Sequence, residues 1–246
     1  MRAIGTENAW FSFKNVRNDE LGVQMLSMPS RPHPARKGKL VDIPGAHGKL
    51  FQDEGVYDRI LVSLRCVAVD NENIDDVNGW LTGEGMLVFG DEPNRAYKAR
   101  ITKEFARNNK NPRLRGQEFT ITFDCEPFRY QATPDEPITL AAMDSITNPG
   151  TEASAPLIYV EGAGEGVLMI GRNTLLFNNL PGHIYVDCEA KIAYTGDGTT
   201  SSPIVLATQH VNGEAGEWVE IEPGENPVQY TEGITKVILT PRWRWL

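Results

Sequence analysis

Strict alternation of apolar and polar residues is the feature that most restricts what this chain can fold into. Between residues 119 and 126 every second side chain is apolar. Successive side chains of a strand point to opposite faces, so a period of two is typical of a strand with one buried face. The same pattern runs through residues 60–69 and 184–189. The apolar phase of the first segment consists of Phe119, Ile121, Phe123 and Cys125.

Turn-forming residues punctuate the whole chain and predict its domain organisation. The 23 glycines and 16 prolines are spread along all 246 residues, which predicts many short strands and an all-β fold class. Two prolines at 134 and 137 and the Asn148-Pro149-Gly150 turn interrupt the pattern. We therefore expect an N-terminal β domain over 1–135, a linker over 136–150 and a C-terminal β-sandwich over 151–246.

One short segment has helical spacing. Asn73 can cap a helix near 74–81. Acidic residues in the first turn of this helix would interact favourably with its dipole. The apolar positions Ile74, Val77, Trp80 and Leu81 share one face of that helix. We expect Trp80 to be a core residue and not a platform for a ligand.

The charges divide unequally between the two halves. Residues 1–135 hold 19 basic and 19 acidic side chains, whereas residues 136–246 hold 5 and 14, so the net charge of −9 lies in the second half. This imbalance favours two surfaces with different partners and argues against nucleic-acid binding by the C-terminal half. A simple acidic domain is the other interpretation.

A basic stretch lies between residues 95 and 115. Its middle is a polar turn flanked by segments that can pair as strands, which predicts a protruding basic hairpin arm. The arm could dock on an acidic protein surface, could be merely solvated, or could touch phosphates. Few aromatic residues are interleaved with its basic residues, so we favour a protein-contact arm. Its basic residues are Arg95, Lys98, Arg100, Lys103, Arg107, Lys110, Arg113 and Arg115.

The three cysteines have no CxxC spacing, and the chain shows no secretory signal segment. We expect reduced thiols, with Cys66 and Cys125 buried in a core because each lies on the apolar phase of a strand. No run of 18 apolar residues exists, so no membrane span is expected.

No motif predicts catalysis, a cofactor or a metal. The run from Gly162 to Gly166 has the wrong spacing for a dinucleotide loop and is interpreted as a hairpin turn. The four histidines show no zinc spacing. Asp187 and Glu189 share a strand face and could form a glycosidase pair, but we interpret them as solvated carboxylates.

The order of several short segments along the chain resembles the distal tail proteins of long-tailed, non-contractile bacteriophages. Each segment is weak alone, and their order carries the resemblance. In the first half they are Ile43-Pro44-Gly45, Trp80-Leu81, Asp91-Glu92-Pro93 with Tyr97, and the strand from Phe123 to Phe128. In the second half they are Asn148-Pro149-Gly150, Pro156 to Val160, Ile184 to Glu189, Pro223 to Asn226, and Pro241 to Arg244.

The resemblance implies a structural role. It implies an N-terminal sandwich or barrel-like domain that forms a ring, a C-terminal galectin-like β-sandwich, and assembly as a hexamer at the distal tip of the virion tail. The implied partners are the tail tube protein, a tail-associated hub protein and, in addition, receptor-binding proteins. DNA would pass through the lumen without specific binding, and the chain would be made in the cytoplasm of the bacterial host.

Two other classes of function remain as alternatives. The galectin-like domain could be a carbohydrate-binding module that contacts host glycans, for which the candidate residues are Trp218, Tyr230, His183 and Asn179. We interpret that domain as structural because these residues form no recognisable run. An enzyme that degrades cell-wall polymers is the third class, and no set of residues supports it.

Overall fold

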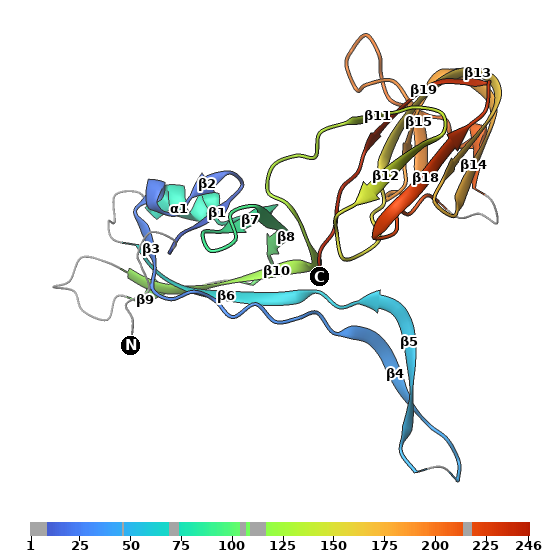
Figure 1. Cartoon of the computed structure of the whole chain (residues 1–246). Coiled ribbons are helices and arrows are strands. Elements are labelled where there is room, and N and C mark those ends of the chain that lie inside the picture. Colours follow the sequence, from blue (N-terminus) through green and yellow to red (C-terminus); the bar gives the residue numbers. More distant parts are fainter. Residues whose placement is uncertain (1–8, 46, 69–73, 104–106, 109–116, 214–217) are drawn as a thin grey trace. The chain divides into compact units, whose positions relative to one another are not determined.

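The computed structural model describes residues 9–45, 47–68, 74–103, 107–108, 117–213 and 218–246. The chain divides into two compact units (Figure 1). Unit 1 comprises residues 1–132 together with Leu246, and unit 2 comprises residues 133–245. The predicted all-β class with one short helix is confirmed.

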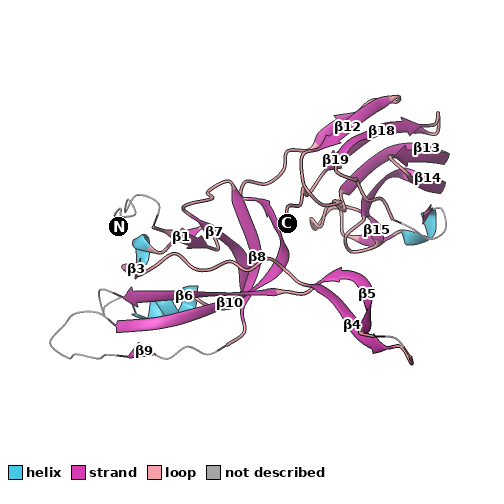
Figure 2. Ribbon diagram, turned by 60° about the horizontal axis from the view of Figure 1, so that its bottom comes forward, coloured by secondary structure: helices cyan, strands magenta, loops and turns pink. Residues whose placement is uncertain are grey.

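Unit 1 contains an antiparallel sheet in the order β2-β1-β7-β8-β10-β6-β3, with β9 pairing with β10 (Figure 2). A separate two-stranded ribbon is formed by β4 and β5. The strands are β1 (Phe11–Phe13), β2 (Val16–Arg17), β3 (Val23–Met25), β4 (Arg36–Asp42), β5 (Lys49–Tyr57), β6 (Ile60–Ala68), β7 (Glu84–Phe89), β8 (Arg95–Ile101), β9 (Arg107–Asn108) and β10 (Gln117–Gln131).

The alternating segments predicted from the sequence form the centre of this sheet. β10 pairs with β6 without interruption from Gln117 opposite Ala68 to Cys125 opposite Ile60. The apolar phases of both strands are buried, as the pattern requires. The ring of Phe123 also contacts Phe13 of β1, at 5.1 Å between centroids. Since β7 and β8 separate β1 from β10, the sheet must curl to bring these side chains together.

The predicted short helix is present and completes this core. α1 spans Ile74–Trp80 and packs its buried Val77 and Trp80 against the sheet. Trp80 stacks on Phe11 and donates a hydrogen bond of 2.7 Å from its indole Nε1 to the carbonyl of Phe13. Trp80 is thus a core residue, as expected. No helix among the described residues is long and apolar enough to span a membrane.

Unit 2 is a nine-stranded antiparallel sheet whose main order is β11-β19-β13-β14-β15-β16. β12 pairs with β18, which also pairs with β13, and β17 pairs with β14. The strands are β11 (Ile138–Leu140), β12 (Asp144–Asn148), β13 (Leu157–Ile170), β14 (Asn173–Asp187), β15 (Ile192–Thr195), β16 (Val205–Leu206), β17 (Val211–Gly213), β18 (Gly224–Tyr230) and β19 (Ile234–Thr240).

The glycine run from Gly162 to Gly166 is not a hairpin turn, and that prediction is wrong. It lies in the middle of β13, and the hairpin between β13 and β14 turns at Gly171 and Arg172. The first half of β13 pairs with β19, and its last residues pair with β18. The pairing of β13 with β14 and with β19 shifts register within this run. At Gly162 a Cβ would lie 2.2 Å from the carbonyl oxygen of Gly233, so the neighbouring backbone leaves no room for a side chain there.

All three cysteines are free and buried, so the expectation for Cys66 and Cys125 is confirmed. Burial raises the pKa of each thiol to about 12, with minor contributions from nearby charges at Cys125 and Cys188. These thiols are therefore protonated and unreactive near neutral pH.

Gly233 tests the role of close backbone approach in unit 2. A Cβ at this position would lie 1.8 Å from the carbonyl oxygen of Glu165. We expect Gly233→Ala to lower the free energy of unfolding of unit 2 by about 1–3 kcal/mol, because the backbone must shift. Urea unfolding followed by circular dichroism measures this change. Gly79→Ala in α1 is the matched control, since an added Cβ there would meet no heavy atom within 4 Å, and it should not destabilise the protein.

Candidate functional site: an exposed ribbon and its anchored base

The ribbon of β4 and β5 is the most exposed regular element in the described part of unit 1. Among the described strands, these two pair only with each other, and they project beyond the eight-stranded sheet (Figure 1). Leu40 lies opposite Phe51, and Val41 lies opposite Leu50. Because directly opposite residues share a face, one apolar pair stands on each side of the ribbon.

These four side chains are largely accessible to solvent. Leu40 is 64% exposed, Leu50 56%, Phe51 46% and Val41 42%. The ring of Phe51 lies over Gly38, where a Cβ would come within 2.6 Å of the ring. An isolated two-stranded hairpin is marginally stable in water, so the ribbon gains little by exposing apolar side chains on both faces. This pattern is typical of a surface that a partner covers.

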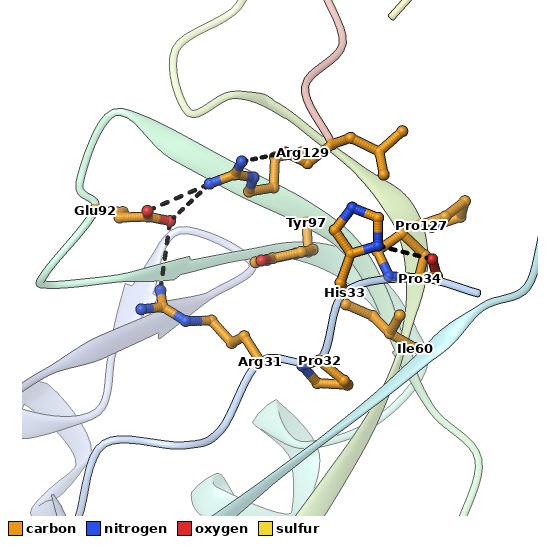
Figure 3. Close-up of a pocket in the computed structure, with 10 residues that line it drawn as sticks. Arg31, Pro32, His33, Pro34, Ile60, Glu92, Tyr97, Pro127 and Arg129 are labelled. Carbon is orange, nitrogen blue, oxygen red and sulfur yellow. Dashed lines mark hydrogen bonds and ion pairs between the residues drawn. The ribbon is translucent and has the colours of Figure 1, made fainter. Parts of the chain in front are cut away.

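The base of the ribbon is anchored by an ion-pair network beside a cavity of about 290 Å³ (Figure 3). Arg31 precedes β4, and its guanidinium contacts Asp91 and lies 3.5 Å from Glu92. Glu92 also accepts hydrogen bonds of 3.3 Å from Arg129 on β10. Arg129 in turn donates to the carbonyl oxygen of Leu246. The segment that enters the ribbon is therefore tied to the turn between β7 and β8.

The cavity itself lies where both strands of the ribbon join the domain. Arg31 to Pro34, which lead into β4, and Ile60, which follows β5, form one part of its lining. Figure 3 shows Tyr97 and Pro127 facing them from β8 and β10. The Nδ1 atom of His33 lies 2.9 Å from the carbonyl oxygen of Pro34. The site thus combines a projecting ribbon with a polar base that ion pairs and hydrogen bonds hold together.

A second network anchors the return strand. Arg59, which follows β5 closely, donates a hydrogen bond of 2.7 Å to Asp124, which also accepts one of 3.1 Å from Arg100. Burial raises the pKa of Asp124, but the hydrogen bonds from the two arginines lower it by more, so its pKa lies below the ordinary value. Asp124 is therefore ionised at neutral pH and holds β5, β8 and β10 together.

The rings at the base add apolar contacts to these charges. Tyr57 at the end of β5 packs edge to face on Phe128, with 5.8 Å between ring centroids. The guanidinium of Arg36, at the start of β4, lies 4.3 Å from the centroid of the Tyr57 ring. Both strands of the ribbon are thereby fixed at the point where they leave the domain.

The structure places the first three basic residues of the predicted arm over 95–115 within the sheet, and a protein-contact role for the arm stays a prediction. Arg95, Lys98 and Arg100 lie on β8, which is enclosed between β7 and β10 and does not protrude. Lys98 lies 4.0 Å from Glu126 and over the ring of Tyr130, and Arg100 binds Asp124. Because Lys98 and Arg100 have acceptors on β10, these two residues stabilise the sheet.

The other residues of that prediction follow β8. Lys103 is exposed in the loop after it, and Arg107 lies in β9, which pairs with β10. Lys110, Arg113 and Arg115 lie outside the described residues. The sequence analysis did not predict the ribbon of β4 and β5. A signal was present, because two apolar residues precede the Ile43-Pro44-Gly45 segment and two follow it, namely Leu40-Val41 and Leu50-Phe51.

The carboxylates considered as a glycosidase pair are engaged by arginines. Arg242 holds Asp187 through two hydrogen bonds of 2.7 and 2.9 Å, and Arg244 lies 3.2 Å from Glu189. Burial raises the pKa of Asp187, and hydrogen bonds from Arg242 and the backbone lower it by more, so the net pKa is lowered. A general acid needs a raised pKa, so Asp187 is unsuited to that role. Among the described residues no group of His, Cys, Asp and Glu could hold a metal ion.

The four candidate sugar-binding residues do not converge. Trp218 lines a cavity of about 530 Å³ together with Arg172 and Glu220, but Tyr230, His183 and Asn179 do not line it. Trp218 and Tyr230 are partly buried against the core of unit 2. His183 packs against Tyr159 on another part of the sheet.

Comparisons with known proteins match this geometry. Residues 18–125 match the family model described as phage tail protein RIFT-related domain. That stretch contains the ribbon, the α1 helix and both anchoring networks except Arg129 and Leu246. No curated protein sequence matches the chain.

Solved structures share the fold of nearly the whole chain. One is the Dit protein of phage SPP1, which is described as a paradigm of the hub adsorption apparatus of phages that infect Gram-positive bacteria. It aligns with a TM-score of 0.70 at 16% sequence identity, and the alignment covers 96% of this chain and 99% of that chain. A chain of the phage P2 baseplate in its activated conformation with Ca aligns with a TM-score of 0.55 at 8% identity, over 94% and 96%. The predicted resemblance to siphophage distal tail proteins is confirmed.

The network around Asp124 gives a testable pH dependence. A carboxylate with a lowered pKa in the folded state stabilises the fold above its unfolded pKa of about 3.9, and this contribution is lost as the pH falls through the folded pKa. We expect Asp124→Asn to lower the free energy of unfolding at pH 7 by about 1–3 kcal/mol, with the difference from wild type shrinking below about pH 4.

Urea unfolding at a series of pH values measures that difference. The control is Asp42→Asn on the ribbon, because Asp42 is 79% exposed and lies 3.2 Å from Lys49. An exposed pair of this kind contributes about 0–1 kcal/mol. A pH-independent effect of Asp124→Asn would contradict the role assigned to its charge.

Proposed function

We propose that this chain is a structural subunit of the distal tip of a long, non-contractile phage tail, where copies assemble head to tail into a hexameric ring. The ring joins the tail tube to a tail-associated hub and to host-adhesion proteins, and DNA passes through its lumen without specific binding. The phage tail domain at residues 18–125 and the fold shared with the SPP1 Dit protein support this role.

The observation that carries the proposal is the two-faced apolar surface of the ribbon. Leu40 with Phe51 and Val41 with Leu50 expose apolar area on opposite faces. A surface of this kind is stabilised when another protein covers it. In a ring each subunit offers one surface to a different surface of the next subunit, so an arm that projects from one copy suits a heterologous contact.

The anchored base supports the same function. Binding to a flexible arm carries the entropic cost of ordering it, whereas an arm held at both strands is already oriented. Arg31 holds the entry to β4, and Arg59 holds the exit from β5. The role is structural, and the arginine-paired carboxylates Asp187 and Glu189 agree with it.

Substitutions on the ribbon test assembly. We expect Leu40→Ser/Phe51→Ser, and separately Val41→Ser/Leu50→Ser, to shift the purified protein from rings toward monomers, because each removes the apolar contact of one face. Size-exclusion chromatography with light scattering and negative-stain imaging measure this shift. The exposed positions predict that folding is retained, which circular dichroism checks.

Met143→Ser is the control, since Met143 is a turn residue of unit 2 that is 88% exposed. It should assemble like wild type. Ribbon variants that form normal six-fold rings would contradict the proposal, as would a wild-type protein that remains monomeric at high concentration.

A further inference from the structure

A row of aromatic side chains crosses the sheet of unit 2. Tyr194 of β15 lies opposite Tyr185 of β14, which lies opposite Tyr159 of β13. Leu206 of β16 extends the row at one end, and Ile238 of β19 extends it at the other. Directly opposite residues share a face, so these five side chains form one aromatic row, which spans about 19 Å at a strand spacing of about 4.8 Å.

The aromatic row lies on the outer face of that sheet. The residues that alternate with it, such as Ile158, Ile184 and Val237, are fully buried in the core of unit 2. The row itself stays accessible, because Leu206 is 64% exposed and the three tyrosines are partly exposed. A continuous apolar and aromatic strip on a solvent-facing sheet is typical of an interaction surface.

A cavity of about 390 Å³ opens at one end of the row. Its apolar lining consists of Pro137, Leu157, Tyr159, Tyr185 and Ile238. The rings of Tyr159 and Tyr185 lie 5.0 Å apart between centroids and are tilted by 59°. The row is therefore hollowed where these two rings stand, and the hollow can accept an apolar side chain of a ligand.

We infer that the aromatic row binds an extended, proline-rich segment of a partner protein in the polyproline II conformation. That helix rises about 3.1 Å per residue and repeats every three residues, so its equivalent side chains stand about 9.3 Å apart. Tyr159 and Tyr194 are two strands apart, which corresponds to about 9.6 Å. A segment that runs along the row places residues i and i+3 over these two tyrosines, and two turns of it span the row. Grooves lined by aromatic residues are the usual receptors of such segments.

The hydroxyl groups of the row supply hydrogen-bond donors. Burial, and after it the carboxylate of Glu161, raises the pKa of Tyr159. Burial, and after it the carboxylate of Asp187, raises the pKa of Tyr194. Both hydroxyl groups are therefore protonated at neutral pH and can donate. A polyproline II segment has no internal hydrogen bonds, so its carbonyl groups are free to accept them.

Charge favours a segment that carries basic residues beside its prolines. Residues 136–246 have a net charge of −9. Near the row, Glu161 of β13 is exposed, and so is Asp197, which follows β15. The one cation that lines the described cavity, Lys236, lies opposite Glu161. Arginine or lysine side chains of the segment are thus attracted to this unit.

The proline-rich stretch of this chain itself, residues 29–34, is already engaged in unit 1. Pro32 and Pro34 line the cavity at the base of the ribbon. Arg31 beside them is paired with Asp91 and Glu92. A different protein therefore supplies the segment. The site belongs to unit 2 alone, so the inference does not depend on the ring assembly proposed above.

Fluorescence anisotropy with the full-length protein tests this inference. The probe is a labelled decaproline with two arginines at each end, and the control probe replaces the prolines by alternating glycine and serine. We expect saturable binding of the decaproline probe and no binding of the control probe at the same concentrations. The reason is that only the first is already extended before it binds.

Substitutions on the row locate the binding. Tyr185→Ser, at the centre of the row, should weaken binding about tenfold or more, because it removes a ring that contacts the segment. Tyr159→Phe keeps the ring and removes the donor, so it should weaken binding about fivefold. Met143→Ser, at a position that is 88% exposed and outside the row, is the matched control and should leave the affinity unchanged. Circular dichroism checks that each variant is folded.

Each outcome decides for or against the segment. Failure of the decaproline probe to bind would overturn the inference, and so would binding that Tyr185→Ser leaves unchanged. Equal affinity for the glycine-serine probe would reduce the contact to charge attraction and would also overturn it. Binding of chitohexaose in place of decaproline, weakened by Tyr185→Ser, would assign the row to a glycan. Saturable decaproline binding that Tyr185→Ser abolishes and Met143→Ser retains would establish the site.

Discussion

The exposed apolar side chains of the β4–β5 ribbon set the main physical constraint on this protein. Leu40, Val41, Leu50 and Phe51 each keep between 42% and 64% of their surface in water. Full burial of such a side chain contributes about 1.5–3 kcal/mol, so covering the remaining half of four of them would contribute about 3–6 kcal/mol. Two strands without a third cannot supply that cover themselves. The exposed pairs are therefore the apolar surface that a partner would cover under the proposed function.

The ion-pair networks at the base determine where that apolar surface is presented. Their partners are partly exposed, so their contribution to stability is modest. Their geometry matters more, because Glu92 links Arg31 to Arg129 and Asp124 links Arg59 to Arg100. Each strand of the ribbon is thereby joined to two different strands or turns of the sheet. A fixed direction reduces the entropy that the ribbon would lose on binding a partner.

Local periodicity predicted the parts of the fold that have one buried face. The alternation around Ile121, Leu64 and Val186 identified β10, β6 and β14, because burial of one face leaves a period of two in the sequence. The ribbon escaped this reasoning because neither of its faces is buried. The run from Gly162 to Gly166 was misread because glycine serves both turns and close backbone approach, and only the partner strand distinguishes them.

The sequence does not show which residues lie together in space, and this also limited the prediction of the basic residues and of the site. Eight cations between residues 95 and 115 resembled an exposed arm, but Lys98 and Arg100 find their acceptors on β10 at Glu126 and Asp124. Those acceptors are more than 20 residues away in the sequence, so a charge count cannot reveal the pairing. The family resemblance was recoverable from the order of turns, because it does not require knowledge of which residues pair.

The geometry of the aromatic row favours a protein partner over a sugar for this face of unit 2. Tyr185 and Tyr194 stack with 5.3 Å between their centroids and 14° between their planes. Tyr159 is likewise stacked on His183, at 26°. Rings whose faces cover one another cannot offer those faces to a pyranose, and they present edges and hydroxyl groups instead. A sugar-binding role for unit 2 would therefore have to rest on the cavity at Trp218, where Arg172 is already engaged by Glu222.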